Sequence, residues 1–123
     1  MLIYISGPIS GIIDRNKKVF QKAEREISSV FKSIKVDKLK IINPVKLGYK
    51  LDALYCAFGK KPEWADYMRI CIEKLCKADF VYLLPGWGIS EGALMEKYIA
   101  TRLGIPCVEN IKELSKLIIG GHK

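Results

Sequence analysis

Short apolar runs alternate along the chain with longer segments in which apolar residues recur every three or four positions. The short runs have the length of β-strands and cover residues 2–6, 40–43, 79–84 and 106–109. The third run is apolar throughout after Asp79, which is typical of a central strand in a parallel sheet that is covered on both faces. We therefore expect four strands, with the third one near the middle of the sheet.

The longer segments predict helices over residues 14–32, 62–77 and 90–103, and a last helix from residue 110 onward. Ser90 suits the N-cap of the third helix, and Glu113 completes a capping box at the start of the last one. Pro44 cannot continue a strand ladder and ends the second strand. Residues 45–61 have no clear period, and we interpret them as a long loop with at most one helical turn, of the kind that often covers a site.

Four strand-helix units within 123 residues predict one α/β domain spanning residues 1–123. The expected fold is a three-layer Rossmann/flavodoxin-like sandwich with a parallel sheet of four to five strands in the order 2-1-3-4. In such a sheet a ligand binds at the carboxyl ends of strands 1 and 3, where the connections leave in opposite directions. Both glycine-rich loops of the chain follow these two strands, which makes this crevice the predicted site.

The net charge of +8 arises entirely in residues 1–61, because the second half is neutral. A basic half can steer a nucleic acid or an anionic small molecule. The lysines are spread along a predicted helix and loop, without stacking aromatic residues or a recognised nucleic-acid motif. We therefore favour solvated lysines or mild steering of a phosphorylated ligand, and nucleic-acid binding is the less favoured interpretation.

The cysteines and the single histidine limit the available chemistry. Cys56, Cys71, Cys76 and Cys107 form neither a C-x-x-C pair nor a zinc framework, so we expect free thiols and no metal or cofactor. His122 stands in the terminal tail, which argues against histidine-based catalysis. The apolar runs are too short to cross a membrane, and the first residues lack the pattern of a secretory signal, so a cytoplasmic location is expected.

The two glycine-rich loops offer backbone amides to a ligand. The residues expected to bind it there are Gly7, Pro8, Ile9, Ser10 and Gly11 in the first loop, and Gly86 and Trp87 in the second. Neither loop is a complete phosphate-binding fingerprint, which argues against P-loop chemistry. Amides beside a helix N-terminus can still hold a phosphate or carboxylate. The alternative is that the glycines only permit tight turns.

Glu96 is the residue that helical spacing marks out. Its neighbours three and four positions away are Gly92, Ala93, Ile99 and Ala100, so its side chain lies on the face that packs on the sheet. A carboxylate in that place needs a partner, a shifted pKa or a ligand. The alternative is a structural tie to a lysine or to Tyr4. Ser90 can present its hydroxyl to a phosphate, although capping alone would explain it.

Several motifs together resemble a phage-borne family of unknown function that is similar to nucleoside 2-deoxyribosyltransferases and deoxynucleoside-monophosphate N-glycosidases. The motifs are Tyr4-Ile5-Ser6-Gly7-Pro8-Ile9-Ser10-Gly11, Ile42-Asn43-Pro44, Trp64-x-x-Tyr67-Met68-Arg69 and Ala78-Asp79-Phe80-Val81-Tyr82-Leu83-Leu84-Pro85-Gly86-Trp87, followed by Ser90-x-Gly92-Ala93-x-x-Glu96. The resemblance covers residues 1 to about 108. It is most specific between Pro85 and Glu96.

The resemblance implies that Glu96 attacks C1′ of a nucleoside sugar and forms a glycosyl ester, which water or a second base then resolves with retention. By the same comparison Tyr4 and the first glycine loop line the site, Ser90 and Gly92 meet the 5′ end, and Asn43 belongs to the ligand-binding set. It also implies a homo-oligomer.

One position departs from the related enzymes. They carry an aspartate, which assists with the sugar and the leaving base, at the position of Cys71. A thiol near its ordinary pKa is neutral and a weak hydrogen-bond partner, so the usual second carboxylate is missing. Asp79 and Asp66 are possible substitutes, although Asp79 suits a turn better.

Three hypotheses follow. The first is an enzyme that acts on the N-glycosidic bond of a small-molecule nucleoside or nucleotide, with Glu96 as nucleophile and Tyr4 and Cys71 beside it. The second is a catalytically weakened nucleotide-binding module of the same fold. The third is a basic accessory protein that binds nucleic acid.

Overall fold

A computed structural model describes residues 1–34 and 38–121. The strands are β1 (Leu2–Ser6), β2 (Lys40–Ile42), β3 (Phe80–Leu83) and β4 (Cys107–Val108). The helices are α1 (Lys17–Ile34), α2 (Pro44–Cys56), α3 (Trp64–Leu75), α4 (Glu91–Arg102) and α5 (Ile111–Gly121), with short 3-10 helices η1 (Ile13–Asn16) and η2 (Trp87–Ile89). No helix in the described ranges is long and apolar enough to cross a membrane. His122 lies outside the described residues.

The four strands form one parallel sheet in the order β2-β1-β3-β4. Tyr4 of β1 lies between Ile42 of β2 and Val81 of β3. The strand order and the parallel pairing confirm the predicted Rossmann/flavodoxin-like α/β fold, with four strands in the sheet that the structure describes. The order changes direction between β1 and β3, so their carboxyl ends flank a crevice.

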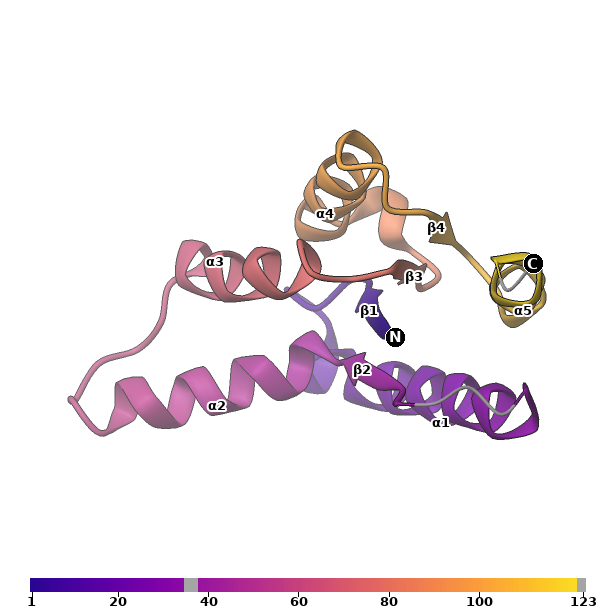
Figure 1. The fold of residues 1–123 in the computed structure, drawn as a ribbon. Helices are drawn as coiled ribbons and strands as arrows, with labels where there is room; N and C mark the ends of the chain where they lie inside the picture. The colour runs from indigo at the N-terminus through magenta and orange to yellow at the C-terminus, as the bar shows by residue number, and fades with distance from the viewer. Residues whose placement is uncertain (35–37, 122–123) are drawn as a thin grey trace.

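Helices cover both faces of the sheet, α1 and α5 on one side and α3 and α4 on the other (Figure 1). Alternate residues of β1 point to opposite faces. Ile3 and Ile5 pack in the core under α1 and α5, whereas Tyr4 packs in the core under α3 and α4. Ser6 is fully buried and, two residues from Tyr4, shares its face. The polar side chains of β1 therefore all point toward α4.

The predicted loop over residues 45–61 is wrong, because α2 occupies most of it. The helix starts with two signals: the Asn43 side chain accepts a hydrogen bond from the Val45 amide at 3.0 Å, and Pro44 takes the first turn. Its buried stripe includes Gly48, which interrupts the apolar spacing in the sequence. The helix packs against α3, and the two extend side by side beyond the sheet (Figure 1).

The other helix boundaries lie close to those predicted. The first long helix begins at Lys17 rather than residue 14, because Asp14, Arg15 and Asn16 have positive φ angles of 52°, 55° and 61°. Ser90 caps α4 by accepting a hydrogen bond from the Ala93 amide, as predicted. Asn110 caps α5 by accepting a hydrogen bond from the Glu113 amide at 2.9 Å, but the Glu113 carboxylate accepts from the Asn110 side-chain amide at 3.0 Å and not from its backbone N–H, so the predicted capping box is formed only in part.

Candidate functional site

A cavity of about 580 Å³ opens at the carboxyl ends of β1 and β3. Its walls are the loop of residues 7–12, Arg15, the first turns of α2, the inner face of α3, and residues 89–96 at the start of α4. This volume lies within the range of small-molecule binding sites. The predicted ligand-binding residues that line it are Gly7, Pro8, Ile9, Ser10, Gly11, Ser90 and Gly92, together with Glu96 and Cys71.

Glu96 lies on the buried side of this cavity, with only 5% of its surface exposed. The Tyr4 hydroxyl donates a hydrogen bond to one carboxylate oxygen, and the Ser6 hydroxyl donates to the other at 2.7 Å. Both donors come from β1 and are fully buried behind the carboxylate. The strand thus fixes the orientation of Glu96, and sequence reasoning missed Ser6 as its second partner.

Among the residues the structure describes, the Glu96 carboxyl accepts hydrogen bonds from two hydroxyls and forms no ion pair with a cation. Burial raises the pKa of the Glu96 carboxyl to about 7, although the hydrogen bonds from Tyr4 and Ser6 act in the opposite direction. Burial and the nearby Glu96 charge also hold the pKa of Tyr4 well above its usual value. Glu96 therefore exists in both protonation states near neutral pH, while Tyr4 stays a hydrogen-bond donor.

Cys71 of α3 lies beside Tyr4 and Glu96 and is 5% exposed. Burial raises the pKa of its thiol to about 11, so the group is neutral at physiological pH. The candidate substitutes for the missing carboxylate lie elsewhere. Asp79 accepts a hydrogen bond from the Leu2 amide at the amino end of the sheet, and Asp66 accepts from the Glu63 amide in the capping box of α3.

The two glycine loops pack tightly against each other. A Cβ atom on Gly7 would come within 2.8 Å of the Leu84 side chain, and one on Gly86, whose φ is +86°, would come within 3.3 Å of Pro8. Glycine is therefore required for the close approach at Gly7 and for the left-handed backbone at Gly86. Gly86 packs against Pro8 of the first loop and is not among the residues that line the cavity.

Trp87 also lies away from the described cavity lining. Its indole nitrogen donates a hydrogen bond to Glu109 at 2.7 Å, and the Lys97 ammonium lies 5.0 Å from the ring centre. These contacts join the second glycine loop to α4 and to the end of β4. The structure therefore gives Trp87 a supporting position.

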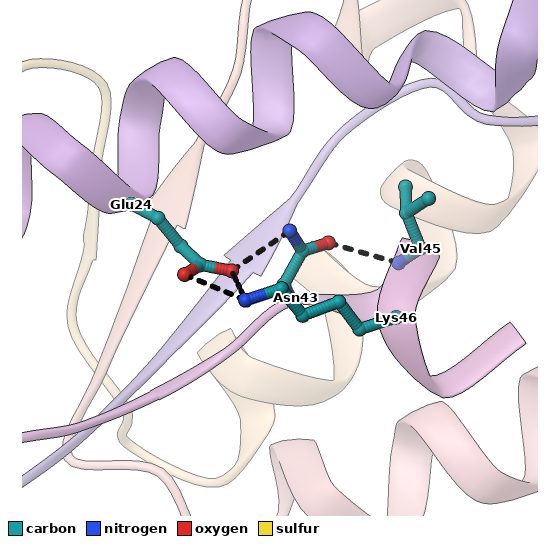
Figure 2. Close-up of polar contacts among 4 residues, drawn as sticks. All are labelled: Glu24, Asn43, Val45 and Lys46. Carbon is teal, nitrogen blue, oxygen red and sulfur yellow. Dashed lines mark hydrogen bonds and ion pairs between the residues drawn. The ribbon is translucent and has the colours of Figure 1, made fainter. Parts of the chain in front are cut away.

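Asn43 is hydrogen-bonded to Glu24 on one side and to Val45 on the other (Figure 2). It is buried, its oxygen caps α2, and its amide nitrogen donates to Glu24 of α1 at 2.9 Å. The Lys46 ammonium reaches the same carboxylate at 3.0 Å. Asn43 is not among the residues that line the cavity, and it joins α1 to α2.

The sequence interpretation missed a cationic group in the cavity wall. Arg15 forms an ion pair with Asp52 of α2 at 2.7 Å, and the Tyr67 hydroxyl donates to the same carboxylate. Trp64 and Met68 of α3 line the cavity next to this group. Asp52 could have been identified by interpreting α2 as a helix. Tyr67 could have been identified from its helical spacing to Cys71, four residues later.

The part of the chain that the structure describes holds no group of three or more histidine, cysteine, aspartate or glutamate side chains placed to bind a metal ion. The cavity lining offers the buried Glu96 carboxyl, the exposed Glu91 carboxyl, hydroxyls, a neutral thiol, an arginine and the backbone amides at the start of α4.

This fold and site define a class: a Rossmann-like α/β protein with a ligand-sized cavity at its central strands and a buried glutamate in the cavity wall. The chain belongs to the DUF4406 family, a domain of unknown function, whose model matches residues 1–109. The match includes the whole sheet and every residue that lines the cavity, and it ends before α5. No curated protein and no solved structure matches the chain.

Proposed function

We propose that the cavity binds a small-molecule nucleoside or nucleotide, and that Glu96 cleaves or transfers its N-glycosidic bond. The observation that carries the proposal is the buried Glu96 carboxyl, which is held by Tyr4 and Ser6 and belongs to the lining of the cavity. Orientation of a nucleophile by neighbouring hydrogen bonds is the general arrangement of covalent catalysis. The motif resemblance described above supports the same chemistry.

In the proposed reaction, an oxygen of the Glu96 carboxylate forms a bond to C1′ of the sugar while the bond from C1′ to the base nitrogen breaks. The electron pair of the broken bond stays on the base, which takes a proton from solvent. Water or a second base then attacks C1′ and loses a proton to solvent while the bond from C1′ to Glu96 breaks and releases the carboxylate, so that two displacements retain the configuration. Tyr4 and Ser6 hold the carboxylate in line for the first attack.

The start of α4 supports an anionic group on the ligand. Ser90 and Gly92 line the cavity, and the first amides of a helix carry a partial positive charge. We therefore expect a 5′-phosphate to bind there. The basic first half of the chain would attract the same anion.

One observation favours a second function, a nucleotide-binding module without turnover. Cys71 occupies the place of the expected second carboxylate, and its thiol is neutral. If assistance to the leaving base is essential, this cavity holds its ligand and releases no base.

The test is release of free base, measured by liquid chromatography, from a panel of ribo- and deoxyribonucleosides with and without a 5′-phosphate. We expect release to be strongest with a monophosphate. Glu96→Gln should lower it by at least about 10³-fold while ligand affinity is kept, because the amide fills the same space and cannot attack C1′. Glu24→Gln, a glutamate with two hydrogen-bonding partners outside the cavity, is the matched control and should retain activity.

Tight binding without release of any base would support the binding module. Neither binding nor release across the panel would contradict both functions.

A further inference from the structure

Arg15 is held by a set of contacts that fix its guanidinium in the cavity wall. Asp52 binds one of its nitrogens at 2.7 Å, and the guanidinium carbon lies 5.0 Å from the centre of the Tyr49 ring and 5.5 Å from that of Tyr67. The Tyr67 hydroxyl in turn donates to Asp52. Although burial acts in the opposite direction, these bonds hold the pKa of Asp52 below its usual value, so the pair stays ionised.

The missing side chain of Gly48 leaves space for the Arg15 guanidinium. A Cβ atom on Gly48 would lie 3.3 Å from the Arg15 guanidinium, so a larger residue in the middle of α2 would displace it. Arg15 itself has a left-handed backbone with φ of 55°, which is uncommon for arginine. The side-chain amide nitrogen of Asn16 donates to the Pro8 carbonyl at 3.0 Å and holds this segment against the first glycine loop.

The Arg15 guanidinium offers hydrogen-bond donors, while its positive charge is balanced by an ion pair. Among the residues the structure describes, Asp52 is the carboxylate within ion-pair distance of Arg15, and it offsets the positive charge. A guanidinium has five N–H donors in a planar fork and no acceptor. The donors not used by Asp52 therefore suit a neutral group with two adjacent acceptors better than a phosphate, for which the start of α4 is available.

Tyr67, whose ring the Arg15 guanidinium faces, lies on the same helix as Cys71. Cys71 is beside Glu96, and Tyr67 precedes it by four residues on α3, a rise of about 6 Å. A sugar whose C1′ meets Glu96 would therefore place its base beside Arg15 and Tyr67. Trp64, one turn further out, also lines the cavity and offers an aromatic surface on which a base can stack.

We propose, on the basis of the function proposed above, that Arg15 is a specificity-determining residue that binds O6 and N7 of a 6-oxopurine base. These two acceptors lie side by side on the major-groove edge of the base, and arginine binds them with two parallel hydrogen bonds. Adenine presents an amino group at the same position, which meets the donors of Arg15 without a partner. The preferred ligands are therefore hypoxanthine or guanine nucleotides.

The experiment compares 2′-deoxyinosine 5′-monophosphate with 2′-deoxyadenosine 5′-monophosphate, by base release and by calorimetric titration. The wild-type protein should prefer the 6-oxopurine by about 5- to 150-fold, the range of one bidentate contact. Arg15→Gln should reduce or reverse this preference, because glutamine pairs with the N6 and N7 edge of adenine. Arg15→Lys keeps the charge beside Asp52 and a donor for O6 or N7 but loses the planar fork, so it should reduce the preference less than Arg15→Gln does. Arg102→Gln, an exposed arginine on α4, is the matched control.

The outcomes separate this inference from the proposed function. Base release with equal rates for the two nucleotides, or a preference that survives in both Arg15 variants, would overturn the role of Arg15 and leave the enzyme intact. Preferential release from pyrimidine nucleotides would overturn the 6-oxopurine class. If no base is released but titration shows a preference that depends on Arg15, the assignment of Arg15 stands and the enzymatic function falls. Thermal melting of each variant shows whether a loss comes from unfolding.

Discussion

Two glutamates of this protein each accept hydrogen bonds from two side chains, yet their surroundings differ. Glu24 on α1 meets the Asn43 amide and the Lys46 ammonium at the surface between α1 and α2 (Figure 2). Glu96 on α4 meets the hydroxyls of Tyr4 and Ser6 in a buried place in the wall of the cavity. The first carboxylate has a cation beside it, whereas the partners of the second are neutral among the residues that the structure describes.

The comparison shows how a structural carboxylate differs from one that is available for chemistry. The partners of Glu24 join two helices, and the Lys46 charge offsets its own. Hydroxyl donors orient Glu96 without offsetting its charge, and burial raises the pKa of Glu96 to about 7. A buried carboxyl with a pKa shifted in this way is a candidate for the reaction proposed above.

The largest expected effect comes from supplying the second carboxylate beside Glu96. Cys71→Asp should increase base release by about 10²-fold or more, because general acid-base assistance commonly contributes about 10² to 10⁴ in rate. Cys71 lines the cavity next to Tyr4, which places the new carboxyl at the reacting groups. The measurement is kcat/KM for the best nucleotide of the panel.

Two controls accompany this variant. A buried, unpaired aspartate destabilises a fold by several kcal/mol, so thermal melting has to be measured together with activity. Cys71→Ser adds a polar group without a charge and should give no gain in rate. A stable Cys71→Asp protein that binds a nucleotide and, like wild type, releases no base would argue that the cavity is a binding module.

The second expected effect is a pH-dependent stability that distinguishes Glu96 from an ordinary carboxylate. The folded-state pKa of Glu96 is raised, so the folded protein binds the proton more tightly than the unfolded chain does. This contribution to stability is fully present below the unfolded-state pKa near 4.5 and is lost as the pH rises through about 7. The loss amounts to about 3 kcal/mol.

The measurement is urea unfolding of wild type and Glu96→Gln at several values between pH 4 and pH 8. The free energy of unfolding of wild type, relative to the variant, should fall as the pH rises, because glutamine does not titrate. In the same range kcat/KM should rise with pH, since the attack on C1′ needs the carboxylate. A difference in stability that stays constant with pH would show that Glu96 ionises near its ordinary pKa.

The sheet was predictable from the sequence because each of its strands is marked by a short apolar run, and because the glycine turns follow strands 1 and 3. The burial of Glu96 was also predictable, since Gly92 and Ala100 stand on the same side of a regular helix. Local spacing was sufficient for both, because both depend on residues that are close in the chain.

The rest of the site depends on contacts between elements that are distant in the chain. Ser6 meets Glu96 across 90 positions, and no local pattern identifies that partner. The contacts of Arg15 with Asp52 and Tyr49 depend on the helix α2. Gly48 interrupts the apolar spacing that would indicate this helix in the sequence. Interpreting residues 45–61 as a loop therefore removed Asp52 from consideration, and with it the contact that marks Arg15.

The smallest expected effect concerns Asn43, which is a hydrogen-bonding partner of Glu24. Asn43→Ala removes the cap of α2 and one partner of Glu24, and should lower the free energy of unfolding by about 1 to 2 kcal/mol. Asn43→Ser keeps an oxygen that can accept from the Val45 amide and should recover about half of that loss. Because Asn43 does not line the cavity, nucleotide affinity should be unchanged in both variants at a temperature where they are folded. A folded Asn43→Ser protein that binds the nucleotide at least tenfold more weakly would instead place Asn43 in the binding site, as the motif resemblance implies. The contacts around Glu24 would then belong to the binding site as those around Glu96 do.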